Sequence, residues 1–213
     1  TVTATNGTCG VEQSTSITVD APDVNIIAST DDCINAGDEV VLSVTGPGSG
    51  SDEVYVGSME TEDAYFPYLS CYNYSMAEQI YTANEIGQRG TINAVSFYLT
   101  SWSQTRNDVQ VYIKHTNKSS FSSETDWVSF SASDMVVSSV SYPYSSVSGW
   151  QTFTFETPFE YDGTSNLIIG VRAGYLPYQC SNNYYCYNAG SDRGLCYYND
   201  DYDNSLESPY TGN

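Results

Sequence analysis

The chain has few cationic residues. Six Lys and Arg stand against 26 Asp and Glu, so the 213 residues carry a net charge of −20. Such a field repels nucleic-acid phosphates and anionic lipid, which excludes both as expected partners. No apolar run approaches the roughly 20 residues needed to span a bilayer, so we expect no direct membrane insertion. A single His and the lack of any Cys-x-x-Cys argue against a zinc site.

Helical periodicity is also nearly absent. Apolar and polar residues alternate instead, as in Glu39–Thr45 and Asp108–His115. The 20 tyrosines and the many β-branched residues are good strand formers. Together with turn signals such as Tyr161-Asp-Gly163, they predict an all-β fold, an antiparallel jelly-roll-like β-sandwich preceded by strands of Ig-like repeats. In the sandwich we expect strands at Glu53–Gly57, Gln79–Thr82, Thr91–Thr100, Asp108–His115, Val136–Tyr142, Trp150–Glu156, Asn166–Arg172, Tyr184–Tyr187 and Leu195–Tyr198, and a helical turn at Ala83–Gly87.

The turn signals also divide the chain. Residues 1–20 are expected to end an Ig-like repeat, and residues 21–46 to open a further Ig-like unit. Residues 47–51 are expected to form a Gly-rich linker, and residues 52–213 the jelly-roll-like sandwich. The sequence opens inside an alternating pattern and closes on a turn signal, so we expect a piece of a longer exported protein. The sandwich would then lack its last strand, which a neighbouring domain or chain supplies by β-augmentation.

Alternation assigns faces to the strands. Val109, Val111 and Ile113 are expected to point inward, with His115 at the tip of the same face. The inward set of Thr91–Thr100 shifts by one residue, which predicts a bulge. Because His115 has no evident nucleophile or ligand partner, we interpret it as a residue that holds loop backbone. No pair of carboxylates lies in a recognisable glycosidase motif, and we expect no enzymatic activity.

The six cysteines indicate disulfides and an oxidising, extracellular setting. Cys180 and Cys186 bracket a short loop and form the favoured local pair, with Cys196 as a competing partner. Cys9 and Cys33 flank two expected strands and either pair with each other or reach a neighbouring domain.

An oxygen-rich segment near the end of the chain is a candidate Ca²⁺ site. The spacing Asp201-x-Asp203-x-Ser205-x-Glu207 presents alternate oxygen ligands of the kind that Ca²⁺ prefers. The segment lacks the Gly of an EF-hand loop, since Leu206 stands there, and Asp-rich turns also occur without any metal. Both interpretations remain open.

Tyrosines crowd into the same region and form the candidate ligand-binding site. The set is Tyr178, Tyr184, Tyr185, Tyr187, Tyr197 and Tyr198, interleaved with Asn and Asp residues. Aromatic rings stack on the apolar faces of sugars while amides and carboxylates bond the hydroxyl groups, which suits a glycan platform. The same tyrosines equally suit packing inside the sandwich, with their hydroxyls reaching water.

Several segments carry a family resemblance in the order in which they occur. They are Gln79–Gly87, Val111–Phe121, Thr125–Val128, Gly149-Trp150, Thr157–Gly163 and Asn166–Ile169. Residues 52–213 thereby resemble a jelly-roll-like module of large secreted and cell-surface proteins of Bacteroidota, which often carry Ig-like or PKD-like repeats and a type IX secretion signal. The resemblance implies an extracellular, non-catalytic module that serves in adhesins or beside hydrolases.

Composition and resemblance together lead to one functional expectation and two alternatives. We expect a non-catalytic module of a secreted or surface-exposed protein, which acts in adhesion through glycans or other surface proteins. The alternatives are an accessory domain of a secreted hydrolase and a structural spacer of a surface fibre or stalk.

Overall fold

The computed structural model describes residues 53–69, 71–101, 106–142, 148–174, 183–203 and 205–209, and the backbone of four short strands that precede them. The chain divides into two compact units, Thr1–Glu53 and Val54–Asn213. In the first unit, β1 (Val2–Ala4) pairs antiparallel with β2 (Gln13–Thr15), and β3 (Asn25–Ala28) pairs antiparallel with β4 (Leu42–Thr45).

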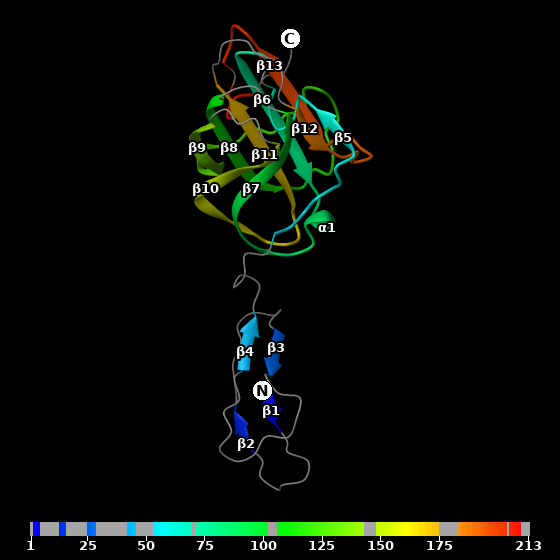
Figure 1. Cartoon of the computed structure of the whole chain (residues 1–213), viewed down its shortest axis with the longest axis vertical. Helices are drawn as coiled ribbons and strands as arrows, with labels where there is room; N and C mark the ends of the chain where they lie inside the picture. Colours follow the sequence, from blue (N-terminus) through cyan, green and yellow to red (C-terminus); the bar gives the residue numbers. More distant parts are fainter. Residues whose placement is uncertain are drawn as a thin grey trace. The chain divides into compact units, whose positions relative to one another are not determined.

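The second unit contains two antiparallel sheets (Figure 1). The four-stranded sheet has the order β10-β7-β12-β5 and the five-stranded sheet the order β13-β6-β11-β8-β9. The elements are β5 (Thr61–Asp63), β6 (Tyr74–Tyr81), α1 (Ala83–Ile86), β7 (Gly90–Ser101), β8 (Arg106–Thr116), η1 (Ala132–Asp134), β9 (Met135–Tyr142), β10 (Gly149–Tyr161), β11 (Asn166–Ala173), β12 (Asn183–Cys186) and β13 (Gly194–Asn199).

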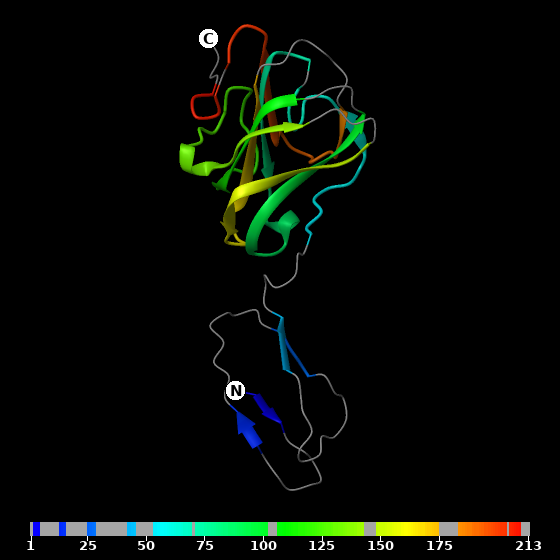
Figure 2. The ribbon, with the colours of Figure 1, turned by 60° about the vertical axis from the view of Figure 1, so that its left-hand side comes forward.

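Consecutive strands repeatedly cross from one sheet to the other, as β9, β10, β11, β12 and β13 do in turn. This alternation is the way a jelly roll closes two layers around one core. In the turned view of Figure 2, the long strands β7 and β10 run side by side. The all-β, antiparallel sandwich expected from the sequence is confirmed.

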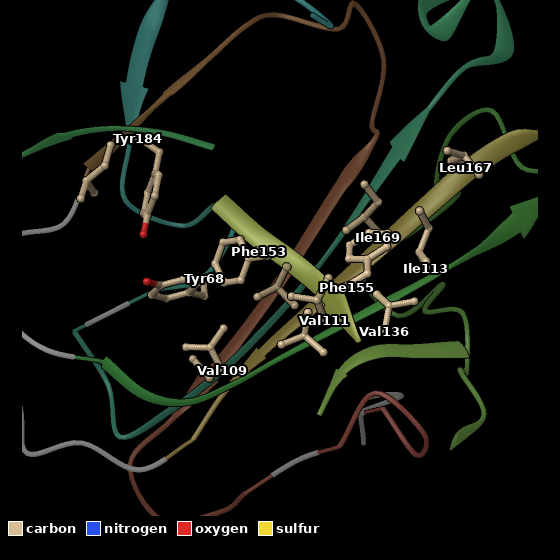
Figure 3. Close-up of a cluster of buried hydrophobic side chains, with 14 of the residues drawn as sticks. Tyr68, Val109, Val111, Ile113, Val136, Phe153, Phe155, Leu167, Ile169 and Tyr184 are labelled. Atoms are coloured by element: carbon tan, nitrogen blue, oxygen red, sulfur yellow. The ribbon is translucent and has the colours of Figure 1, made fainter. Parts of the chain in front are cut away.

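The main core lies between the two sheets. Figure 3 shows Val109, Val111 and Ile113 of β8 meeting Phe153 and Phe155 of β10, as the alternation predicted. Burial of such side chains stabilises the fold by about 1.5–3 kcal/mol each. The core therefore holds the two sheets together and leaves the outer faces to be considered separately.

The bulge expected from β7 is present in the pair β7–β10. Thr154 lies opposite Ala94 and Phe159 opposite Ile92, so β10 has extra residues between these pairs. The helical turn also forms and ends at Gly87 in the left-handed conformation. The expected strand at residues 53–57 is absent, and the strand expected at Gln79–Thr82 is the end of the longer β6. The sequence pattern missed β5, whose three residues are too few to show alternation.

The outer faces of the two sheets differ. β11 is buried along both faces because the segment 117–134 and the turn at Leu206 cover the five-stranded sheet, packing Phe121, Phe130 and Leu206 against it. In contrast, β10 alternates between buried and exposed residues from Trp150 to Glu156. The outer face of the four-stranded sheet, here called the open face, is therefore accessible among the described residues.

Candidate functional site

Four aromatic side chains contact one another in succession on the open face. Tyr55, Trp150 and Tyr185 are 63%, 49% and 38% exposed, and Tyr98 is half-buried between its neighbours. The ring centroids are 5.7 Å apart from Tyr55 to Trp150, 5.3 Å from Trp150 to Tyr98 and 5.6 Å from Tyr98 to Tyr185. We call these four residues the aromatic row.

Strand register positions the row. Trp150 of β10 lies directly opposite Tyr98 of β7, and β12 pairs with the other side of β7 to bring Tyr185 next in line. Successive residues of a strand point to opposite faces. Because Gln151 and Tyr184 point into the core, Trp150 and Tyr185 must point outward.

A buried polar cluster fixes those inward residues. The hydroxyl of Tyr184 donates to Oε1 of Gln151 at 2.7 Å, and Nε2 of Gln151 donates to the hydroxyl of Tyr68 at 3.2 Å. Figure 3 shows the hydroxyl groups of Tyr68 and Tyr184 pointing toward each other. A buried hydrogen bond resists displacement because its groups have no water to replace their partners. The cluster therefore anchors β10 and β12 next to the row residues that they carry.

Polar groups border the row. Glu62 of β5 lies opposite Tyr185. Oε2 of Glu62 accepts a hydrogen bond from Nδ2 of Asn183 at 3.4 Å. Ser96 and Thr152 form the next cross-strand pair beside Tyr98 and Trp150, and their hydroxyl oxygens are 2.8 Å apart. The open face thus combines ring surfaces with donors and acceptors, the combination that recognises sugars.

The structure separates the tyrosines proposed from the sequence. Tyr184 is 1% exposed and belongs to the core, so its assignment to a ligand-binding surface is wrong. Tyr187 packs against Gly57 and donates to Oε1 of Glu85, and Tyr197 packs against the cluster that covers the five-stranded sheet. Tyr178 lies outside the described residues. Of the six, only Tyr185 joins the aromatic row.

Tyr198 belongs to another aromatic group, on the five-stranded sheet. Its ring centroid is 4.3 Å from that of Tyr72 and 6.0 Å from that of Tyr65. Strand β13, which carries Tyr198, pairs with β6 and not with any strand of the open face. The rings collected by sequence proximity thus lie on different sheets.

The candidate Ca²⁺ ligands are largely engaged with protein groups. Nε of Arg172 donates to Asp203 at 3.0 Å, and a second guanidinium nitrogen bonds the same carboxylate. Oγ of Ser205 accepts from the backbone of Glu207 at 3.1 Å, and Asp201 is exposed. Within the described part of the chain, no group of three or more His, Cys, Asp or Glu residues could hold a metal ion. Calcium binding at Asp201, Asp203, Ser205 and Glu207 stays a prediction.

His115 has the role that the sequence indicated. Its Nε2 accepts a hydrogen bond from the backbone N–H of Asp162 at 3.2 Å, and its ring stacks on Tyr161. It thereby holds the turn between β10 and β11, which confirms the interpretation as a residue that binds loop backbone.

The expected disulfide of Cys180 with Cys186, and the alternative with Cys196, are wrong. Cys186 and Cys196 are free thiols, whereas Cys71 is disulfide-bonded. Burial raises the pKa of Cys186 to about 11 and that of Cys196 to about 12, so both remain protonated and poor nucleophiles at neutral pH. Cys9 and Cys33 lie outside the described residues.

Sequence reasoning missed Tyr55, Tyr98 and Trp150 as surface residues. From the sequence, Trp150 counts with Phe153 and Phe155 among the large apolar residues that stabilise a core if they are buried. Alternation could have identified it as a surface residue. Trp150 lies an odd number of positions from Phe153 and from Phe155, so its side chain points to the face opposite to that of these two buried residues.

In the part of the chain that the structure describes, no helix has the length and apolar character needed to cross a bilayer. A scan against family models, a search of curated proteins and a search of solved structures each returned no match.

Proposed function

We propose that the chain is a non-catalytic, glycan-binding module of a large secreted or cell-surface protein, and that the aromatic row is its binding surface. The observation that carries the proposal is the succession of four contacting rings on the open face, three of them well exposed. Large exposed aromatic residues in a contiguous group mark interaction sites, and rings bordered by carboxylates, amides and hydroxyls suit sugars.

The resemblance to secreted and surface modules of Bacteroidota supports the same interpretation. The disulfide of Cys71 supports an extracellular location, because disulfides persist in oxidising surroundings. The same surface serves an adhesin and an accessory domain of a hydrolase equally well, because both hold a polysaccharide without reacting with it. A structural spacer does not require exposed aromatic rings. The row therefore favours an adhesin or an accessory domain over a spacer.

Affinity electrophoresis on gels that contain a polysaccharide tests the proposal. The full chain is expected to be retarded by at least one glycan of a broad panel. Trp150→Ala and Tyr185→Ala should each weaken binding roughly thirtyfold, since truncation of a central aromatic contact costs about 2 kcal/mol.

Tyr65→Ala is the matched control, because Tyr65 is a similarly exposed tyrosine outside the row. Its retardation should equal that of the wild type. Absence of binding to every glycan, or equal retardation of all variants, would refute the proposed function.

A further inference from the structure

The rings of the aromatic row stand at steep angles to one another. The interplanar angle is 59° between Tyr55 and Trp150, 82° between Trp150 and Tyr98, and 45° between Tyr98 and Tyr185. A crystalline polysaccharide presents many sugar faces in one plane, and only coplanar rings can stack on several of them together. Rings at these angles pack on one another in a tilted or edge-to-face manner and offer no common plane on which such a surface could stack.

Steps of 5.3 to 5.7 Å between ring centroids are of the size of one sugar unit. A single chain in solution can rotate about its glycosidic bonds, so successive sugars can turn to follow rings of changing orientation. A chain fixed in a crystal lattice cannot do so. The geometry of the row therefore favours one separated chain.

Negative charge borders the row at Glu62, which lies opposite Tyr185. A second carboxylate, Glu156, lies farther along the exposed side of β10. Hydrogen bonds from the backbone and hydroxyl of Ser138 lower the pKa of Glu156, which keeps it ionised.

Four of the cationic side chains bind carboxylates elsewhere. Lys118 pairs with Asp126, Arg193 with Glu85, Arg172 with Asp108 and Asp203, and Lys114 with Asp134. The cation–π contacts among described residues involve Phe130 and Tyr187, which are not in the row. An acidic ligand would meet like charge at the row, and so would a second copy of this chain with its net charge of −20.

On the premise of the proposed function, we infer that the row binds a single hydrated chain of uncharged sugars. It discriminates against acidic polysaccharides by charge and against crystalline polysaccharide surfaces by ring orientation. Because the attraction comes from stacking and neutral hydrogen bonds, binding changes little with salt, in contrast to the steep salt dependence of binding between opposite charges.

The test compares three classes of polysaccharide on the full chain. The soluble uncharged class contains mixed-linkage glucan, xylan, galactomannan, galactan and dextran; the acidic class contains alginate, polygalacturonate and hyaluronan; the crystalline class contains cellulose and chitin. Soluble polysaccharides are tested by affinity electrophoresis and crystalline ones by pull-down, at low salt and at about 0.15 M NaCl, where screening is substantial.

We expect the full chain to bind at least one soluble uncharged polysaccharide, with an affinity that changes less than twofold with salt. Trp150→Ala should lower this affinity at least tenfold, and Tyr65→Ala should not lower it. Row-dependent binding to an acidic or crystalline polysaccharide as strong as to any uncharged chain would overturn the inference while leaving glycan binding intact. Binding to no glycan at all would overturn both. Dimerisation of the wild type that Trp150→Ala abolishes, measured by light scattering, would assign the row to a second copy instead.

Discussion

Two neighbouring tyrosines of β12 have opposite roles because of strand alternation. Tyr184 donates a hydrogen bond to Gln151 in the core, while Tyr185 stands in the aromatic row. Both residues are tyrosines, so removal of the hydroxyl group at each position is the same chemical change. Any difference in its effect on the free energy of unfolding then comes from the difference in burial.

We expect Tyr184→Phe to lower the free energy of unfolding by about 1–2 kcal/mol, because Gln151 loses a buried partner. Tyr185→Phe should change it by less than about 0.5 kcal/mol, since its side chain is exposed. Urea unfolding followed by circular dichroism measures both values. Equal effects at the two positions would contradict the assignment of Tyr184 to the core.

Glu78 is a fully buried carboxyl on the side of β6 that faces the covering segment 117–134. Its Oε2 accepts a hydrogen bond from the backbone N–H of Val128 at 3.0 Å, and its Oε1 has no protein partner. Burial raises the pKa of Glu78 to about 8, against the opposing effect of that hydrogen bond and of Lys114 and Lys118. Folded Glu78 therefore keeps its proton at neutral pH, whereas the unfolded chain releases it.

This difference makes stability depend on pH. Below the ordinary pKa of Glu both states are protonated and the contribution of Glu78 is fully present. It is lost as the pH rises toward the folded value of about 8. The Tm of the wild type should therefore fall between about pH 5 and pH 8. In Glu78→Gln, which cannot ionise at this position, the fall in Tm over the same range should be smaller by roughly 5 °C.

Exposed Glu124→Gln, in the same covering segment, is the control and should leave the pH profile of Tm unchanged. Calorimetric scans across the range decide the matter. A parallel decline in wild type and Glu78→Gln would show that Glu78 does not remain protonated in the folded protein.

At the scale of the element, β11 illustrates how one strand is buried on both faces. Its inward side chains join the core between the sheets, and on the other side Gly170 leaves room for Phe130 and Leu206. A Cβ atom at Gly170 would lie 2.8 Å from each of these side chains. The covering segment can therefore sit directly on the backbone of the sheet.

Gly170→Ala should destabilise the protein by about 2 kcal/mol, because the added methyl group forces the covering side chains away from β11. Gly149→Ala is the matched control: a Cβ atom added to this strand glycine would have no described atom within 4 Å, and the substitution should be nearly neutral. Thermal unfolding compares the two. A neutral Gly170→Ala would mean that the segment does not pack closely on β11.

At the scale of the whole molecule, sequence patterns predicted most of the second unit. Long strands such as β8 and β11 carry enough alternating or apolar residues to be recognised. The shift in the inward set of Thr91–Thr100 indicated a bulge that is present in the pair β7–β10, with the extra residues in β10. Strand β5 was missed because three residues show no period.

The candidate site was harder to predict because it depends on strand order. Tyr98 and Tyr185 are far apart in the sequence and meet only because β12 pairs with β7. Tyr184, Tyr185 and Tyr198 are close in the sequence but lie in different places. Tyr184 points into the core, Tyr185 lies on the open face, and Tyr198 belongs to the five-stranded sheet. Alternation along one strand predicts the face to which a side chain points. Which rings that side chain contacts depends on the order of the strands in the sheet, which alternation does not predict.

The position of Trp150, Tyr98 and Tyr185 on three adjacent strands has a consequence for how such a surface can diversify. Adjacent strands lie about 4.7–4.9 Å apart, a distance fixed by backbone hydrogen bonds. The spacing of the three strands that carry these rings is thus set by the sheet and not by the choice of side chain. Exchange of Tyr for Trp or Phe at these positions would therefore change the ring at each position while the distance between the strands that carry the rings stays the same.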